Sequence, residues 1–291
     1  MFRTPILLVA FVSGTLSAQT DALFHMEKAR SAYDANEMGI AMAQADSALT
    51  MDREVPGGFK LRGDIKQRQG DLHGAMVDYV KAEKVDPDDP RLYVSRSAIH
   101  ITEGRVKEAI RDADRALDLD KTDADAWYNR ACANYLGQNN DAALRDIERA
   151  LDLRPENADA LFLRGVVKGE LYKEKDGIAD IEAAIALKPS IAGSRMSLAV
   201  LLFEDKRYEE AIEQFGKVIA AKDADLKEAY YYRADCYYAL ENKEKACADW
   251  RIAADMGDGD AKFIERNYCN TDEDKIPKKP VRGRRRSVIE F

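Results

Sequence analysis

A pattern with a period of 34 residues runs through most of the chain. Its clearest copy spans residues 124–157, where a small residue, two residues at helical spacing and a stop stand at Ala131, Ile147, Ala150 and Pro155. Moving forward by one period places Gly165, Ile181, Ala184 and Pro189 at the same positions. Moving back by two periods places Gly63, Tyr79, Ala82 and Pro87 there. Such self-similarity predicts a stack of similar units, each of which buries its apolar face against its neighbours.

Each copy of the pattern predicts a hairpin of two helices. The small residue lets a second helix approach closely, a polar turn such as residues 137–140 follows, and a Pro stops the second helix. Between the chain ends, every Pro lies at a junction between copies (Pro56, Pro87, Pro90, Pro155 and Pro189). No predicted helix interior therefore contains the residue that would break it. Seven repeats can be placed in one continuous domain over residues 22–270, with one extra residue near Asp225: 22–55, 56–89, 90–123, 124–157, 158–191, 192–226 and 227–260, with a capping helix at 260–270.

The residues that recur at these positions resemble the tetratricopeptide repeat. The likeness lies in a large residue at position four, small residues at positions eight and twenty, an aromatic or aliphatic residue at twenty-four, Ala at twenty-seven and Pro at thirty-two. It implies an all-α, right-handed superhelical solenoid of about seven helical hairpins with a C-terminal capping helix. It also implies a binding function, because such repeats hold partner proteins or peptides on their concave face.

Charged residues also follow the period. Position seven of each repeat from the second onward is Arg except in the sixth, and position twenty-three is Asp except in the sixth, which has Leu198 and Gln214. Because Arg and Asp are absent together, and because a guanidinium binds a carboxylate bidentately, we expect structural ion pairs between them. The predicted pairs are Arg62 with Asp78, Arg96 with Asp112, Arg130 with Asp146, Arg164 with Asp180, and Arg233 with Asp249.

The resemblance places a partner groove on the first helix of each repeat. Carried over position by position, the groove of repeats four to seven would contain Tyr128, Asn129, Tyr135, Phe162, Val166, Met196, Val200, Phe203, Tyr231, Tyr232, Asp235 and Tyr238. An aromatic stripe at helical spacing can equally be core. Its recurrence in four repeats favours a partly exposed apolar groove. The Lys, Asn and Arg set by which chaperone-binding relatives clamp a peptide carboxylate is not found at the matching positions.

The first residues predict export. Arg3 precedes the apolar run from Ile6 to Val12, and the small residues Ser17 and Ala18 follow, which is the layout of a signal peptide at residues 1–18. The alternative is an uncleaved N-terminal anchor. We expect a periplasmic or outer-membrane-associated protein of a Gram-negative envelope.

Export makes disulfides compatible with the four Cys of the chain. The pair we favour is Cys247, in the last repeat, with Cys269, at the end of the capping helix. Cys132 and Cys236 stand at helix positions far apart along the array, so we expect buried and unreactive thiols there.

The end of the chain changes in composition. Residues 1–274 contain 38 Lys and Arg against 52 Asp and Glu, a net charge of −14, whereas residues 275–291 contain seven Lys or Arg and one Glu. We expect residues 271–291 to be a disordered basic tail. Two hypotheses follow: the tail docks on the acidic array of its own chain, or it binds anionic lipid headgroups or lipopolysaccharide.

No catalytic pattern stands out in the sequence. His25, His73 and His100 are isolated, and no zinc, nucleophile-elbow or phosphate-loop motif is present. We therefore expect no catalytic residue, metal or cofactor, and the predicted export argues against nucleic acid as a partner. The predicted function is a non-enzymatic exported scaffold that holds a peptide segment or a partner protein in its groove. The alternative is a membrane-surface tether that acts through the basic tail.

Overall fold

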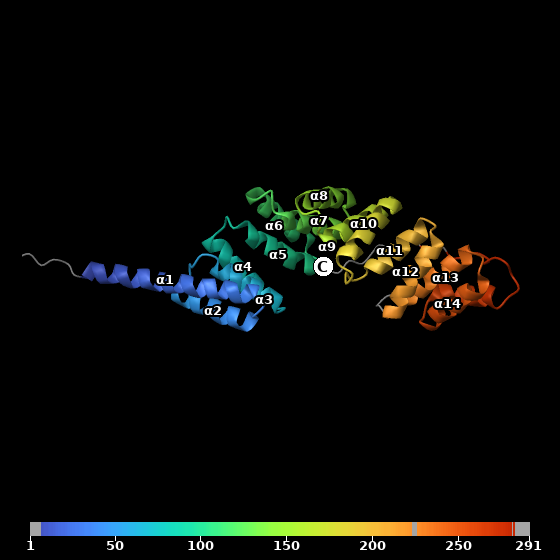
Figure 1. Ribbon diagram of the computed structural model, residues 1–291, viewed down its shortest axis with the longest axis horizontal. Coiled ribbons are helices and arrows are strands. Elements are labelled where there is room, and N and C mark those ends of the chain that lie inside the picture. The colour runs from blue at the N-terminus through green and yellow to red at the C-terminus, as the bar shows by residue number, and fades with distance from the viewer. Residues whose placement is uncertain (1–6, 223–225, 281, 283–291) are drawn as a thin grey trace, which may run out of the picture. The chain divides into compact units, whose positions relative to one another are not determined.

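The fold is built from helices, as the sequence predicted. The computed structural model (Figure 1) describes residues 7–222, 226–280 and 282, with side chains from residue 19 onward. Every regular element in these residues is helical. The α-helices are α1 (Leu7–Asp34), α2 (Met38–Met51), α3 (Gly58–Arg68), α4 (Leu72–Val85), α5 (Pro90–Thr102), α6 (Val106–Leu119), α7 (Ala124–Leu136), α8 (Asn140–Leu153), α9 (Ala158–Glu170), α10 (Glu174–Leu187), α11 (Ser194–Glu204), α12 (Tyr208–Ala221), α13 (Leu226–Ala239), α14 (Lys243–Asp255) and α15 (Gly259–Ile264), and a π-helix, η1 (Glu265–Cys269), follows them.

In repeats one to three and five to seven, the two helices pack on each other as the hairpin that the 34-residue period indicates. The first and second helices of the seven repeats are the pairs from α1–α2 to α13–α14, and the predicted capping helix corresponds to α15 and η1, which pack on α14. Local signals in the sequence fix where several helices begin. Short polar side chains accept hydrogen bonds from the first free backbone N–H groups of the helices that follow Asp71, Asp89, Asp123, Asn139, Asn157, Asn242 and Asp258.

A left-handed residue closes the turn inside every hairpin. The residues with positive φ at this position are Asn36, Gly70, Gly104, Gln138, Tyr172, Lys206 and Glu241, spaced by 34 residues except for a last step of 35. The longer step places the extra residue between Lys206 and Glu241, where the sequence predicted it. Because five of these residues carry a Cβ, most of the turns hold a residue type that disfavours this conformation.

The small residue at position eight allows the two helices of a hairpin to touch. At Gly165 a Cβ would lie 2.6 Å from Ile181 Cγ1 and 2.7 Å from the backbone oxygen of Gly177. At Gly63 it would lie 2.5 Å from the ring of Tyr79. The periodic small residue is therefore a packing requirement of the hairpin.

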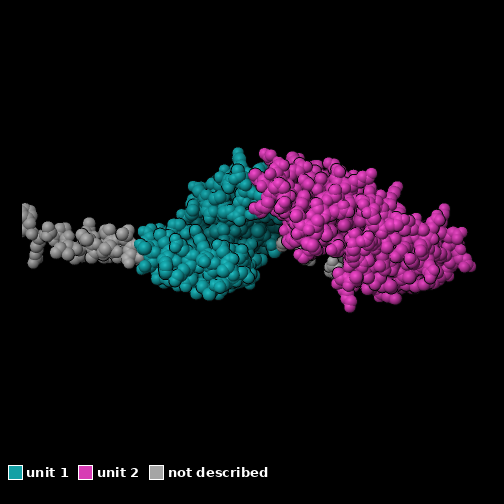
Figure 2. All heavy atoms as spheres, viewed as in Figure 1, with its two compact units in different colours: residues 1–137 teal, residues 138–291 magenta. Residues whose placement is uncertain are grey.

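The repeats gather into two compact units, residues 1–137 and 138–291 (Figure 2), where the sequence analysis treated the array as one domain. In the N-terminal unit, alternate helices α1, α3, α5 and α7 pack on one another, and so do α9, α11 and α13 in the C-terminal unit. Fully buried side chains include Ile65, Tyr79 and Leu92 in the first unit and Leu163, Phe215 and Trp250 in the second. The division falls inside repeat four, in the turn between α7 and α8, and a stack in which each element contacts only its neighbours has no central core that would prevent it.

The predicted signal peptide is only partly within the structure. Residues 1–6 lie outside the described residues, and residues 7–18 are the first part of α1, which begins before the predicted first repeat. Among the described residues, no helix combines the length and the apolar character that crossing a membrane requires.

Candidate functional site

Arg and Asp join the two helices of four repeats. Both guanidinium and carboxylate groups face inward, and each Arg donates two hydrogen bonds to one carboxylate: Arg62 to Asp78 at 2.8 Å and 2.8 Å, Arg96 to Asp112 at 2.7 Å and 2.8 Å, Arg164 to Asp180 at 2.8 Å and 2.6 Å, and Arg233 to Asp249 at 2.7 Å and 2.9 Å. All four carboxylates are buried. These pairs hold the hairpins together, so the Arg side chains have a structural role.

The same Arg residues also reach the preceding repeat, which sequence reasoning missed. Arg62 donates to Asp46 at 2.8 Å, and Arg96 donates to Glu83 at 2.6 Å. The fifth predicted pair has Arg130 in the N-terminal unit and Asp146 in the C-terminal unit; within its own unit, Arg130 donates to Asp114 at 2.8 Å. Asp46 and Asp114 hold the same position in their repeats, so the period contained this signal as well.

Most of the predicted groove residues lie inside the protein. Tyr135, Phe162, Val166, Met196, Val200, Tyr231 and Tyr232 are buried, so the prediction of a partly exposed apolar groove is wrong for them. The cause is packing between repeats. The ring of Tyr232 lies 5.6 Å from that of Phe203, on the first helix of repeat six, and 6.0 Å from that of Phe215, on the second. These aromatic residues are the core between consecutive hairpins.

The remaining groove residues differ among themselves. Asn129 is buried and donates hydrogen bonds to the carbonyl of Val94 (3.0 Å) and to Ser97 Oγ (2.8 Å), which ties α7 to α5. Tyr128, Phe203 and Tyr238 are half-buried.

The end of the chain covers the inner face of the last repeat. Residues 271–280 and 282, here called the C-terminal segment, lie on α13 and α14, so the prediction of a disordered tail is wrong for them. Ile276 is 8% exposed, and its backbone N–H donates to Tyr238 Oη at 3.4 Å. Lys279 Nζ lies 2.8 Å from Asp235 Oδ2. Residues 281 and 283–291 lie outside the described residues.

Arg282 makes the second charged contact of this segment. It donates to Asp258 at 2.5 Å and 2.6 Å and to Asp260 at 2.8 Å, and its guanidinium lies 3.3 Å from the centre of the Tyr231 ring. Three of the predicted groove residues, Tyr231, Asp235 and Tyr238, therefore contact the C-terminal segment, which turns at Pro277 and Lys278. The hypothesis of a tail that docks on its own acidic surface agrees with this geometry.

The pKa of Asp235, on this face, is raised above its ordinary value. Burial raises its pKa, and the pairing with Lys279 and the nearby charge of Arg282 only partly oppose that rise. The Trp250 indole also lowers the pKa, although it stands outside hydrogen-bond geometry. A buried carboxylate of this kind is stable only beside a cation.

A disulfide fixes the start of the C-terminal segment. The structure joins Cys247 of α14 to Cys269 of η1, with 5.5 Å between their Cα atoms. Next to it, the Tyr268 ring packs against Tyr238, with ring centroids 5.6 Å apart, and Lys243 Nζ donates to the carbonyls of Thr271 and Glu273. Cys132 and Cys236 are buried thiols, and burial raises the pKa of Cys236.

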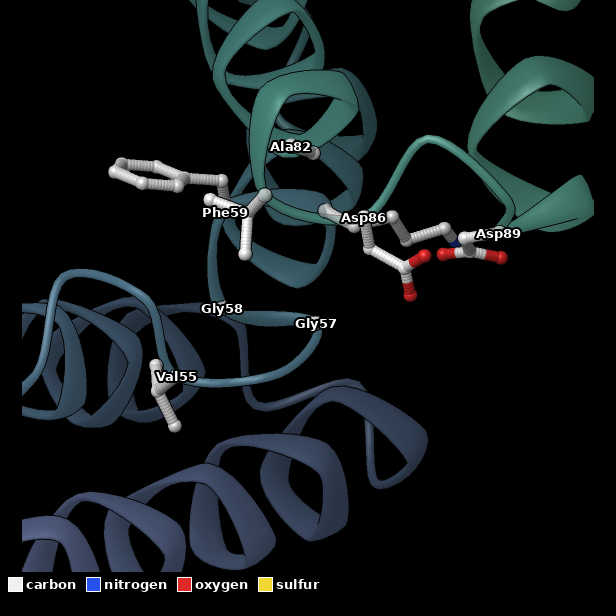
Figure 3. A pocket seen from close by; sticks show the side chains of 9 residues that line it. Val55, Gly57, Gly58, Phe59, Ala82, Asp86 and Asp89 are labelled. Carbon is white, nitrogen blue, oxygen red and sulfur yellow. The ribbon is translucent and has the colours of Figure 1, made fainter.

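Two hollows of the N-terminal unit offer no comparable site. The first, between the start of α3 and the end of α4, is lined by Val55, Phe59 and Asp86 among others (Figure 3). Its cavity volume of about 10 Å³ is that of one water molecule. The second, about 550 Å³, lies over Asp46, Arg62 and Lys81, and Arg62 is already paired there with Asp46.

The histidines do not form a reactive cluster. His100 is buried with its Nε2 at 3.5 Å from Asp112 Oδ2, and burial lowers its pKa. His25 Nδ1 is hydrogen-bonded to Gln44 at 2.7 Å. Within the part of the chain that the structure describes, no group of His, Cys, Asp and Glu is placed to hold a metal ion.

Comparison with known families identifies the repeats. The profile of the tetratricopeptide repeat matches residues 60–124, 99–144, 128–167 and 175–227, which together are more than half of the chain. The chain belongs to the tetratricopeptide repeat family. No curated protein matches this tetratricopeptide repeat protein by sequence.

Solved structures with the same fold include other tetratricopeptide repeat proteins. One from Parabacteroides merdae has a TM-score of 0.56 at 19% identity, covering 85% of this chain and 98% of its own. YrrB, described as having an unusual peptide-binding site, has a TM-score of 0.58 at 24% identity, covering 65% of this chain and 97% of its own. PilF of Pseudomonas aeruginosa has a TM-score of 0.58 at 18% identity, covering 76% and 94%. At these identities the likeness shows the fold.

Proposed function

We propose that this tetratricopeptide repeat protein is a non-enzymatic exported scaffold that holds a peptide segment of a partner protein on the inner face of its last repeat. The observation that carries the proposal is the C-terminal segment itself. Its Lys279 and Ile276 contact Asp235 and Tyr238 of α13, which supports the binding of a peptide segment at the same surface. The family supports the same reading, because tetratricopeptide repeats are protein-interaction modules.

Two features support export. The layout of residues 1–18 is that of a signal peptide. The disulfide between Cys247 and Cys269 would persist in an oxidising compartment such as the periplasm. Cell fractionation and N-terminal sequencing of the mature protein test this part: we expect a periplasmic or envelope fraction and an N-terminus near Gln19. A cytoplasmic protein that retains Met1 would refute it.

The binding role can be tested by photocrosslinking in cells that produce the full chain. A photoreactive amino acid at Tyr238, on the proposed binding face, should crosslink a segment of a partner, which mass spectrometry of the crosslinked peptides would locate. The same group at Ile252, exposed on α14, is the matched control and should not crosslink that segment. Equal crosslinking at both positions, or crosslinks to this chain alone, would contradict the proposal.

The tether alternative depends on free cations in the tail. The structure pairs Lys279 and Arg282 with carboxylates, whereas Lys275 and Lys278 are exposed. If the protein acts as a scaffold without binding lipid, the full chain should not sediment with vesicles of anionic phospholipid. Sedimentation that is lost in the Lys275→Gln/Lys278→Gln variant would favour the tether over the scaffold.

A further inference from the structure

We propose that the last repeat recognises a basic segment with the spacing apolar-x-x-Lys-x-x-Arg, and that the chain's own Ile276, Lys279 and Arg282 occupy the site until such a segment of a partner protein displaces them. The inference rests on the proposed function and specifies the chemistry of the partner. It follows from two cation sites, one apolar contact and three buried polar atoms that the docked segment leaves without hydrogen bonds.

The first cation site is made by Asp235 and two aromatic rings. Lys279 Nζ lies 2.8 Å from Asp235 Oδ2, 5.3 Å from the centre of the Tyr238 ring and 6.0 Å from that of Trp250. Asp235 is 7% exposed, so removing the ammonium group would leave a buried negative charge without a counter-charge. The faces of aromatic rings also attract cations. This site therefore selects a positive charge.

The second site takes a guanidinium. Asp258 is buried and caps α15 by accepting a hydrogen bond from the Ala261 N–H at 2.9 Å, and both of its oxygens also accept from Arg282. With Asp260 on one edge and the Tyr231 ring beneath, the arrangement matches the planar, multiply donating guanidinium better than an ammonium group.

The two sites set the spacing of the ligand. Lys279 and Arg282 are three residues apart, and Ile276, the buried apolar contact, stands three residues before Lys279. The segment turns between the first two anchors, at Pro277 and Lys278, where Lys278 has a φ of 54°, so Ile276 and Lys279 stand at the two ends of a tight turn. Pro277 and Pro280 lie between the anchors and have no backbone N–H to donate. The contacts of the segment with α13 are therefore made mainly by its side chains.

The chain's own segment fits this surface incompletely. Tyr231 Oη, Asp235 Oδ1 and Trp250 Nε1 are buried, and none of them has a hydrogen-bond partner among the described residues. Buried polar groups are ordinarily satisfied, and leaving them unpaired weakens the complex that buries them. A partner segment that supplies a donor and an acceptor at these atoms would replace the internal segment.

The test uses the full chain and a labelled peptide with the sequence of residues 274–284. Fluorescence anisotropy would compare the wild type with the Lys279→Gln/Arg282→Gln variant, whose internal segment has lost both cations. We expect the variant to bind the peptide at least tenfold more tightly, because the site is open. The Lys275→Gln/Lys278→Gln variant removes the same charge from exposed positions and should bind like the wild type. Circular dichroism would verify that all three chains are folded.

Peptide controls separate recognition from general attraction to an acidic protein. A scrambled peptide of the same composition should bind the opened variant at least tenfold more weakly than the ordered peptide. Equal binding of the two peptides would overturn the inference, and so would equal affinity of the three proteins. If no peptide binds while crosslinking at Tyr238 still locates a partner segment, the scaffold function stands and the cationic specificity is wrong. If the ordered peptide binds the opened variant but no partner crosslinks, the inferred site stands and the scaffold function is wrong.

Discussion

In repeats two and three, the Arg at position seven binds two carboxylates, one in its own repeat and one in the preceding repeat. Arg62 binds Asp78 of its own hairpin and Asp46 of the preceding one, and Arg96 binds Asp112 and Glu83 in the same way. A planar guanidinium can serve two carboxylates at once because its donors point in several directions. In repeat six, Leu198 replaces the Arg, and Gln214 replaces the Asp with its Oε1 buried and unpaired among the described residues.

Arg233 and Asp249 offer the clearest test of these pairs. Replacing Arg233 by Leu leaves Asp249, which is buried, without the cation that donates to it. We expect the free energy of unfolding to fall by about 3–5 kcal/mol. The Arg233→Leu/Asp249→Gln variant copies repeat six and should lose only about 1–3 kcal/mol, since it buries no charge. Urea unfolding measures both, and equal midpoints for the single and double variants would show that the charges are not coupled.

Asp78 should make stability depend on acid. Burial raises the pKa of Asp78, but hydrogen bonds from Arg62 and Lys66 outweigh it, and the pKa in the folded protein is lower than usual. The unfolded chain has a pKa of about 3.9 at this residue, so the stabilisation is complete above that pH and is lost as pH falls through the lower folded value. Thermal unfolding between pH 7 and pH 2 should show a shallower acid loss in Asp78→Asn than in the wild type. The same loss in both would assign the acid sensitivity to other groups.

At the scale of the element, the turn between the two helices has the same backbone geometry in every repeat. All seven turns contain a residue with positive φ, yet only Gly70 and Gly104 are the residue type that accepts it without strain. The hydrogen bonds around the turn explain how the others are held. In repeat six, for example, the N–H of Lys206 donates to the carbonyl of Phe203 at 3.0 Å, and that of Arg207 to the carbonyl of Leu202 at 2.9 Å.

Replacing Lys206 by Gly should therefore stabilise the protein. The left-handed conformation costs a residue with a Cβ about 1–2 kcal/mol, and the greater freedom of Gly in the unfolded chain returns about 0.4–1 kcal/mol of that. We expect a net gain of roughly 0.5–1 kcal/mol from these two terms. Gly104→Ala is the matched reverse change, because a Cβ there would meet nothing within 4 Å. It should destabilise the chain; a loss from both changes in thermal unfolding would contradict the strain argument.

At the scale of the whole molecule, opposite charges draw the tail of the chain onto the last repeat. The array is acidic and the tail basic, and the structure brings Lys279 and Arg282 onto Asp235, Asp258 and Asp260. The disulfide between Cys247 and Cys269 holds the cap on α14, directly before the segment that makes these contacts. The proposed binding surface therefore lies directly beside the cross-link that holds the cap.

Removing this disulfide should loosen the last repeat. The Cys247→Ala/Cys269→Ala variant frees a loop of sequence separation 22. We expect it to lose about 3 kcal/mol of stability, which is the loop-closure value for that length. Urea unfolding of the variant and of the wild type with and without reductant measures the effect, and reduction should not change the variant. Non-reducing peptide mapping that finds Cys236 joined to Cys247 would refute the pairing.

The array could be read from the sequence because its signals are local and periodic. The spacing of Ala131, Gly165 and their equivalents predicts hairpins, and the shared absence of Arg and Asp in repeat six predicts the ion pairs of the other repeats. Cys247 and Cys269 could be paired because both belong to the end of the array. Helix propensity, turn chemistry and charge matching act over one hairpin, so one period of sequence contains them.

The proposed binding surface could be identified only from the tertiary structure. Periodicity places Tyr231 and Tyr232 on the inner side of their helix, but packing against Phe203 and Phe215 of the preceding hairpin buries Tyr232, and the Arg282 guanidinium covers the ring of Tyr231. Net charge indicated that the tail would be drawn to the array, yet electrostatic attraction has no direction that would select one carboxylate. Packing around α13 made that selection, because it buries Asp235 among Tyr238 and Trp250 and so leaves a carboxylate that needs a cation.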